Sequence, residues 1–372
     1  FRVTSRLEGR QDPVRRIDLS LENSQVASST EPAAIANAIL GYLDRWAFES
    51  EPADLHLHAG CVVSKTGAIL LVGASGAGKS SLVLHLSEGG LGYATDEVVK
   101  LDRLARVEGL RRPIAIKRQG WHVFEGQFDD LAAQKLLTFR DRLRRWSRPT
   151  LRLHSVSQSL RAPAADDSVV ATEVSTRFVS PRELVQPEGL EPWCARVVVF
   201  CERQHTGVVR LQPVSAAVGV TRLLAHCFDA DRLGREAFER LLRLAASATF
   251  VVAEYQEGAD VVAPLRALVD TAVERHAAVT RVPPAGSTGL RRSPRTISWV
   301  IDNEVVIAEK SSGITVALGG SIVPLWELLE GGVGLDDVVH SLATITGESP
   351  ALIRHDVSGA LEDLDRHGFI EW

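Results

Sequence analysis

The sequence predicts two folded parts, an α/β domain followed by a small α+β domain of winged-helix type. The first part contains an apolar run at 69–72, the pattern G-x-x-x-x-G-K-S at 73–80, and then residues suited to a helix. The second part follows a stretch rich in Pro, Gly, Ser and Arg at 281–296, and its short strand patterns give way to three helical patterns. Because such a stretch is typical of a linker, we expect domains at 1–280 and 297–372.

The pattern at 73–80 is suited to binding a polyphosphate. Its glycines let the backbone bend so that successive N–H groups point inward at the phosphates, and the following helix adds the positive end of its dipole. Lys79 can reach the β and γ phosphates, and the Ser80 hydroxyl can ligate Mg²⁺. We therefore expect ATP and Mg²⁺ as ligands. The expected nucleotide contacts are Gly73, Ser75, Gly76, Ala77, Gly78, Lys79, Ser80 and Ser81.

Composition excludes several other classes of protein. The net charge of the 372 residues is −5, so the whole chain shows no preference for nucleic acid or anionic membranes. No run of about 18 apolar residues and no N-terminal charged-then-apolar signal is present, so we expect a cytoplasmic protein without a membrane contact. The four cysteines lack metal-binding spacing, which fits small buried residues in a reducing compartment: Cys61, Cys194, Cys201 and Cys227.

Hydrophobic periodicity predicts the remaining elements. In the first part we expect a helix at 33–46, a strand-rich region at 55–102, a strand at 196–200, helices at 215–228 and 231–246, and a strand at 249–255. In the second part we expect a hairpin of strands 298–301 and 305–308, a third strand at 313–318, and helices at 321–330, 335–346 and 350–367. Two irregular segments, 120–129 and 161–167, have the character of loops that cover a site or of solvated surface.

Acidic residues follow the next short strand after the loop. Asp96 and Glu97 come directly after 92–95, which places them at the carboxyl edge of the sheet, where open α/β folds bind ligands. One carboxylate can hold Mg²⁺ and the other can take the proton of an acceptor hydroxyl. His58 lies fifteen residues before Gly73, on a strand expected to pair with the strand that precedes the loop. By spacing alone, a lone histidine such as His58 is more often structural or surface-bound than catalytic.

Residues 56–102 resemble the HPr kinase/phosphorylase family and its lasso-peptide kinase relatives. The resemblance rests on His58-Ala-Gly, the loop at 73–80, and Tyr93-Ala-Thr-Asp96-Glu97. It implies a fold like the nucleotide domain of phosphoenolpyruvate carboxykinase and phosphate transfer to a serine of a protein or peptide. It also implies that His58 assists at the transferring phosphate, Asp96 acts as base, and Ser80 with Glu97 holds Mg²⁺. Relatives assemble, so the resemblance makes a homo-oligomer an expectation.

The sequence departs from that family at two places. The acidic pair is Asp-Glu instead of Asp-Asp, and the family's E-V-R-G motif is absent. The nearest remnant is Thr172-Glu-Val-Ser-Thr-Arg177, which makes Arg177 the counterpart of the family's arginine by resemblance only. This loss favours a one-way kinase over a kinase that also runs in reverse. Residues 86–90 are partly similar to the ABC-transporter motif, but they are better interpreted as the end of the helix after the loop.

Residues 298–372 resemble the PqqD-like recognition module of ribosomal peptide biosynthesis. The resemblance rests on Thr315-Val-Ala-Leu-Gly-Gly-Ser, Leu325-Trp326-Glu-Leu-Leu-Glu-Gly-Gly and Gly368-Phe-Ile. In that family a leader peptide adds as a strand to the third strand and lies against the third helix. The residues expected to bind a leader are therefore Gly313, Ile314, Thr315, Val316, Ala317, Leu318, Arg354 and Val357.

DNA binding is the rival function for a winged-helix shape. From 297 to 372 the chain has three Lys or Arg against thirteen Asp or Glu, a net charge of −10. Because a duplex backbone would be repelled, the charge favours a peptide partner over nucleic acid. The sequence as a whole predicts an ATP-dependent kinase of a precursor peptide. Two alternatives remain open: a nucleotide-binding protein that delivers a peptide to a partner enzyme, and a small-molecule kinase.

Overall fold

The computed structural model describes residues 1–8, 14–21, 24–30, 32–117, 176–187, 191–204, 207–272, 275–282, 289–310 and 314–372. The chain divides into two compact units, Phe1–Leu43 with Pro113–Ser180, and Asp44–Arg112 with Pro181–Trp372. Helix α1 (Pro32–Ser50) crosses the division between them. The expected loops at 120–129 and 161–167 lie outside the described residues.

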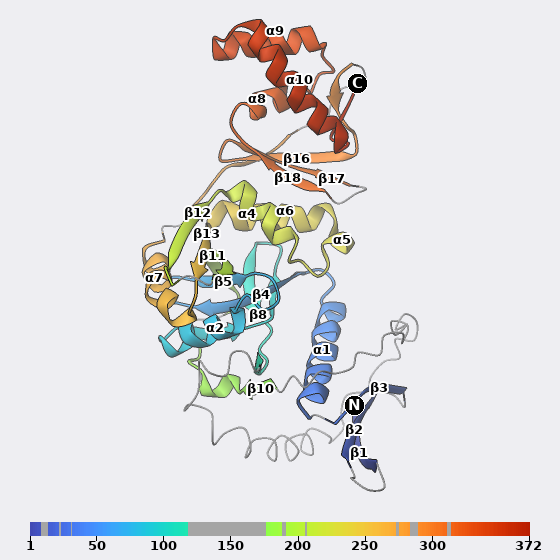
Figure 1. The fold of residues 1–372 in the computed structure, drawn as a ribbon, viewed down its shortest axis with the longest axis vertical. Helices are drawn as coiled ribbons and strands as arrows, with labels where there is room; N and C mark the ends of the chain where they lie inside the picture. The colour runs from blue at the N-terminus through green and yellow to red at the C-terminus, as the bar shows by residue number, and fades with distance from the viewer. Residues whose placement is uncertain are drawn as a thin grey trace. The chain divides into compact units, whose positions relative to one another are not determined.

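The first unit contains an antiparallel meander that the sequence analysis did not predict. Strands β1 (Arg2–Glu8), β2 (Val14–Leu21) and β3 (Ser24–Ser29) pair in order, and Leu19 packs with Ile35 and Ile39 of α1 in a small core. Strands β9 (Ile114–Lys117) and β10 (Thr176–Val179) form a separate antiparallel pair. Figure 1 labels the three strands of the meander and β10 of the separate pair.

The second unit is built on a mixed sheet with the strand order β12-β13-β11-β5-β4-β7-β8, to which β6 adds by pairing with β4. Strands β5, β11 and β13 run parallel, and the other pairs are antiparallel. The strands are β4 (Leu55–Val63), β5 (Ala68–Val72), β6 (Gly92–Thr95), β7 (Val98–Leu101), β8 (Arg106–Gly109), β11 (Trp193–Arg203), β12 (Arg210–Val214) and β13 (Thr249–Tyr255).

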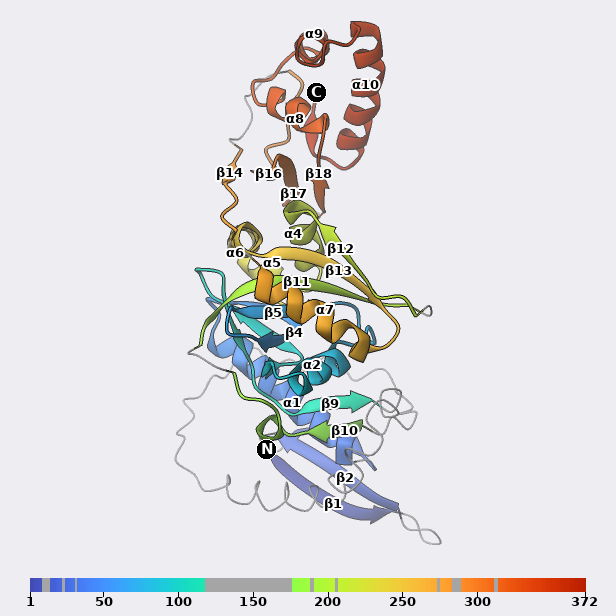
Figure 2. The same cartoon turned by 90° about the vertical axis from the view of Figure 1, so that its left-hand side faces the viewer.

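Helices cover both faces of this mixed sheet, as Figure 2 shows. Helices α2 (Lys79–Glu88) and α7 (Gly258–Thr271) lie on one face, and α4 (Ala216–Leu224) and α6 (Arg235–Ser247) lie on the other. A short helix η2 (Pro181–Glu183) precedes β11. The strands in the middle of the sheet are buried on both faces, which explains their continuous apolar runs.

Two expected helices depart from the bounds that their periodicity suggested. The helix expected at 231–246 is divided into α5 (Ala230–Leu233) and α6 by Gly234, whose φ of 53° is a conformation that other residues rarely adopt. The helix expected at 215–228 ends as α4 at Leu224. The chain beyond α4 instead runs along the edge of β4, where Cys227 bridges Leu57.

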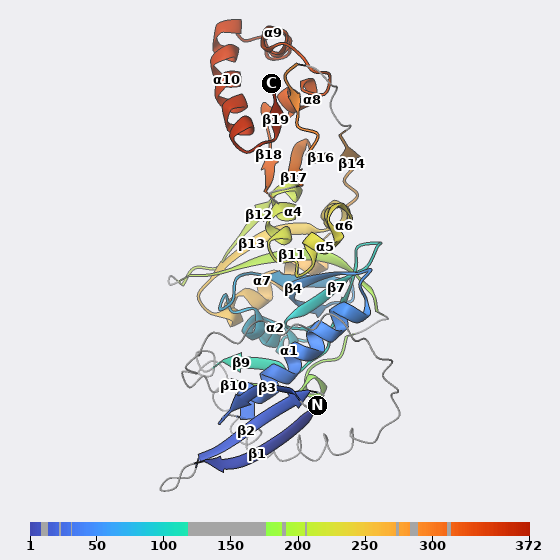
Figure 3. The ribbon, with the colours of Figure 1, turned by 90° about the vertical axis from the view of Figure 1, so that its right-hand side faces the viewer.

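The C-terminal domain forms a sheet of order β14-β16-β17-β18 with three helices on one face, which Figure 3 shows from the side. Its elements are β14 (Val279–Arg281), β15 (Arg291–Arg292), β16 (Thr296–Ile301), β17 (Glu304–Glu309), β18 (Thr315–Leu318), α8 (Ile322–Leu328), α9 (Leu335–Thr346), α10 (Pro350–Arg366) and β19 (Ile370–Glu371). The expected hairpin turn is present, with positive φ at Asp302 and Asn303.

Much of the expected linker at 281–296 belongs to this C-terminal domain. β14 pairs with β16, and β15 pairs with β19. The domain also shares a core with the mixed sheet: Val306 and Ala308 of β17 face α4 and α6, whereas Val305 and Ile307 face α8–α10. Because β17 is buried on both faces, its run Val-Val-Ile-Ala does not alternate between apolar and polar residues.

Candidate functional site

The glycine-rich loop at 73–80 lies between β5 and α2, as the motif requires. Gly76 and Gly78 have φ values of 87° and 90°, which glycine adopts without strain. A Cβ on Gly73 would lie 2.9 Å from the Cys201 carbonyl oxygen, so the loop also needs glycine where it passes β11. The Tyr255 hydroxyl donates to the Ala77 carbonyl at 3.0 Å. The loop is therefore held in one shape by strands β11 and β13.

Lys79 lies against the loop at the beginning of α2. Its Nζ donates to the Gly73 carbonyl at 2.7 Å and to the Ala74 carbonyl at 3.2 Å, and the side chain is only 6% exposed. The ammonium group is thus confined to the bend of the loop. An anionic ligand seated there would meet both this charge and the amino end of α2.

Ser80 and Asp96 meet at the carboxyl edge of the sheet. The Ser80 hydroxyl donates to Asp96 Oδ2 at 2.9 Å, although sixteen residues separate the two in sequence. Asp96 follows β6 and is 1% exposed. Burial raises its pKa to about 6, although the charge of Arg112 and the Ser80 hydroxyl both favour the carboxylate. A hydroxyl and a carboxylate in contact at this position are oxygen ligands suited to Mg²⁺.

His58 and Glu97 form a second pair beside Asp96. His58 Nε2 lies 3.3 Å from Glu97 Oε1, and the two side chains are 26% and 34% exposed. Burial acts to raise the pKa of Glu97, but the hydrogen bond from His58 and the charge of Arg112 outweigh it and hold the pKa below its usual range. The pair is therefore more accessible to solvent than Asp96, and its carboxylate is charged at neutral pH.

Arg112 is a site residue that the sequence analysis missed. Its guanidinium lies 2.6 Å from Asp44 Oδ2, 3.6 Å from Glu97 Oε2 and 3.8 Å from Asp96 Oδ1. The Tyr93 hydroxyl donates to the Arg112 carbonyl at 2.7 Å. One cation therefore faces three carboxylates. No spacing rule connects Arg112 to them, because β7 and β8 intervene and Asp44 comes from α1.

Other predicted site residues have different locations. Ser75, Ala77 and Ser81 belong to the loop or the first turn of α2. Arg177 lies on β10 in the other compact unit, where its backbone pairs with Ile116. Among the described residues, no group of three or more His, Cys, Asp or Glu could by itself hold a metal ion. Mg²⁺ needs few protein ligands when phosphate oxygens and water supply the others, so Ser80 and the acidic pair still fit this ion.

The predicted peptide-binding residues lie along β18 and α10, with one exception. Gly313 is outside the described residues. β18 is the last strand in the order of its sheet, and Ile314 before it is 38% exposed. Arg354 on α10 is exposed and pairs with Asp336. The Val357 side chain is 5% exposed and packs in the core of the C-terminal domain, so it stabilises α10 and is not on the surface that a leader would contact.

The Glu309 N–H donates to the Ile314 carbonyl at 2.9 Å, which shows which residue pairs of β17 and β18 are hydrogen-bonded. In an antiparallel ladder, bonded and non-bonded pairs alternate. Val316 and Leu318 therefore bond to β17, and Ala317 directs its N–H and carbonyl toward the outer edge. This outer edge has the form that accepts an added strand.

Comparison with known families agrees with part of this description. Residues 304–370 match the family model described as Coenzyme PQQ synthesis protein D (PqqD). The chain therefore carries a PqqD-type domain, which confirms the resemblance for the C-terminal domain. This match does not extend to the loop or the acidic pair. No curated protein matches the chain. In the described part, no helix is both long and apolar enough to cross a membrane.

Proposed function

We propose that the protein is an ATP-dependent kinase of a ribosomally synthesised precursor peptide, whose leader is bound by the PqqD-type domain. The observation that carries the kinase proposal is the contact of Ser80 with Asp96 next to the confined Lys79. This arrangement has the parts that phosphoryl transfer needs: a loop for the phosphates, a cation that neutralises charge, and ligands for Mg²⁺. The PqqD match at 304–370 supports the part of the proposal in which the substrate is a peptide.

In the proposed reaction, a serine or threonine hydroxyl of the peptide attacks the γ phosphorus of ATP. The bond from that phosphorus to the bridging oxygen breaks, ADP leaves, and the hydroxyl proton goes to a carboxylate of the protein. Mg²⁺ would neutralise the charge that develops on the phosphates. Lys79 and the loop N–H groups position the phosphates.

We assign Asp96 with Ser80 to Mg²⁺, and Glu97 with His58 to the acceptor hydroxyl. This assignment differs from the roles that the family resemblance implies, and exposure is the reason. A hydroxyl arriving from solvent reaches Glu97, which is 34% exposed, more readily than Asp96, which is 1% exposed. His58 then orients Glu97 through their hydrogen bond.

Two variants separate these roles. Asp96→Asn is expected to raise the Mg²⁺ concentration needed for half-maximal transfer, because a metal ligand loses its charge. Glu97→Gln is expected to lower kcat at saturating Mg²⁺ while leaving the Mg²⁺ requirement unchanged. Steady-state kinetics with the two variants, titrated with Mg²⁺, test the assignment. The opposite pattern would restore Asp96 as the base.

The leader is proposed to add to β18 as an antiparallel or parallel strand and to contact the exposed side of α10. Backbone hydrogen bonds from Ala317 would supply affinity without demanding a particular leader sequence. The net charge of −10 at 297–372 disfavours nucleic acid as the occupant. Isothermal titration with the synthetic leader alone, without the core, tests this part separately from phosphate transfer.

A further inference from the structure

A short segment after α4, residues 226–228, lies along the edge of β4 next to the glycine-rich loop. β5 covers only the later part of β4, since Val72 pairs with Ala59 and the next residue, Gly73, begins the loop. Beyond that point, the His58 N–H donates to the His226 carbonyl at 2.8 Å, and the Phe228 N–H donates to the His56 carbonyl at 2.9 Å. The segment at 226–228 therefore lies where a longer β5 would have continued, directly beyond the beginning of the loop.

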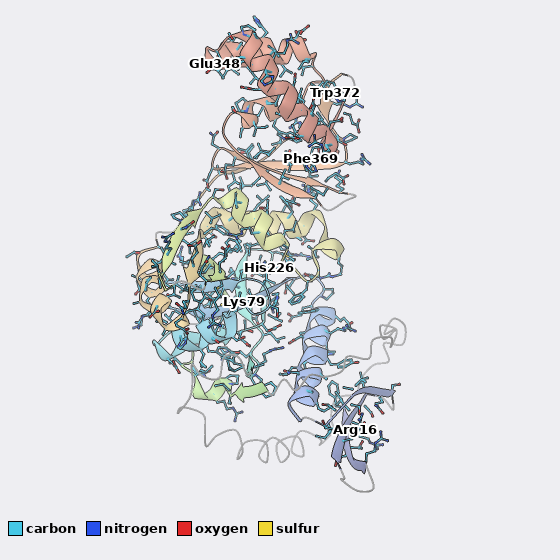
Figure 4. All side chains as sticks on the ribbon, in the orientation of Figure 1. Arg16, Lys79, His226, Glu348, Phe369 and Trp372 are labelled. Atoms are coloured by element: carbon cyan, nitrogen blue, oxygen red, sulfur yellow. The ribbon has the colours of Figure 1, made fainter. Side chains whose placement is uncertain are left out.

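The His226 imidazole is half-buried at this place. Burial lowers its pKa, and the nearby charges of Lys79, His58 and Arg222 lower it further. His226 is thus a neutral imidazole with one N–H donor within electrostatic reach of Lys79. Figure 4 labels His226 and Lys79. Among the described residues, no group forms a hydrogen bond with this imidazole.

Helix α4 holds His226 in a fixed position. The Ser215 hydroxyl caps the amino end of α4 by accepting from the Val218 N–H. A Cβ on Gly219 would lie 2.4 Å from the Phe250 ring, so α4 packs against β13 at the closest distance that glycine permits. One turn before His226, Arg222 pairs with Glu202 at the carboxyl end of β11. The contacts of Gly219 and Arg222 fix α4 relative to β13 and β11, the two strands that also hold the loop.

We propose that His226 is a further catalytic residue, which donates a hydrogen bond to an oxygen of the γ phosphoryl group while that group moves to the acceptor. The inference rests on the proposed function. His226 neither gains nor loses a proton in this step, because the acceptor proton goes to Glu97. The His226 N–H would contact the γ phosphoryl group from the segment between α4 and β4, and Lys79 would contact it from the loop, so two different elements hold this group.

The test compares His226→Ala with His226→Gln and His226→Asn, which each retain an N–H donor at the reach of one ring nitrogen. All three keep the backbone carbonyl that accepts from His58. We expect His226→Ala to lower kcat about 100-fold, the loss typical of one donor to a transferring group. The dissociation constant of ATP should change less than about threefold, because the contact strengthens only as the group transfers. At least one amide variant should recover activity to within about tenfold of wild type. His340→Ala, an exposed histidine on α9, is the control.

A second readout separates failure of this inference from failure of the proposed function. ADP with aluminium fluoride imitates the transferring group and needs no peptide. The wild-type protein should bind this complex more tightly than ADP alone, and His226→Ala should lose most of that difference. Equal transfer by His226→Ala and wild type, or an unchanged preference for the fluoride complex, would overturn the inference. A wild-type protein that binds the fluoride complex through His226 but phosphorylates no peptide would instead overturn the proposed substrate.

Discussion

Asp96→Asn should make the ligand-free protein more stable while raising the Mg²⁺ concentration that phosphate transfer needs. Asp96 is 1% exposed, and its burial raises the pKa from an ordinary value of 3.8 to about 6. The folded state therefore resists ionisation of this carboxyl. Asparagine has the same shape and no charge, and its carbonyl oxygen can still accept from the Ser80 hydroxyl.

The size of the effect follows from the shift in pKa. A rise from 3.8 to about 6 corresponds to about 3 kcal/mol of destabilisation when the carboxyl is charged in both the folded and unfolded states. Since the folded pKa is the higher one, the penalty is absent below pH 3.8, grows as the pH rises, and is complete above about pH 6. The difference in stability between the variant and wild type should follow the same course.

Thermal unfolding at pH 5 and pH 8, monitored by tryptophan fluorescence, measures this difference. At pH 8 the variant should melt roughly 5 to 10 °C above wild type, and the gap should narrow at pH 5. Adding Mg²⁺ and ATP should stabilise wild type more than the variant. A variant that melts below wild type at pH 8, or a difference in melting temperature that does not change with pH, would refute the claim that burial destabilises the charged Asp96 carboxyl.

Three further predictions concern the loop, the shared core and the outer edge. Lys79→Ala should abolish transfer and leave leader binding unchanged, as mass spectrometry and titration calorimetry would show; transfer by this variant would contradict the role of the loop. Phe238→Ala should destabilise the protein by about 3 to 5 kcal/mol in urea unfolding, because Phe238 stacks on Trp299 with ring centroids 4.7 Å apart. Ile345→Ala, at an exposed position on α9, is the control, and equal effects of the two would argue against a shared core. Ala317→Pro should weaken leader binding about tenfold by removing an outward N–H, whereas Ala317→Val should not; equal affinities would exclude strand addition at β18.

The sequence was informative wherever one local pattern determined the structure. The loop at 73–80, β13, α9 and the Asp302–Asn303 turn follow from glycine placement, apolar periodicity or turn chemistry. The pairing of the strand that carries His58 with the strand before the loop was also predictable, because β4 and β5 form a hairpin.

The parts that depend on distant residues were not predictable in this way. Arg112 faces carboxylates from two distant segments, α1 and the turn after β6. His226 reaches the site only because α4 ends four residues before the apolar periodicity does. The expected linker at 281–296 contains β15 and the last residue of β14. These short strands pair with β19 and β16, which lie later in the chain, and no local pattern marks the pairings.

The proposed kinase activity is best tested by incubating the protein with Mg²⁺, ATP and a synthetic precursor peptide, followed by intact and fragment mass spectrometry. We expect the gain of one phosphoryl group on a serine or threonine of the peptide core. A peptide that binds the protein in the presence of ATP but keeps its original mass would contradict the account and favour a protein that delivers the peptide to a partner enzyme.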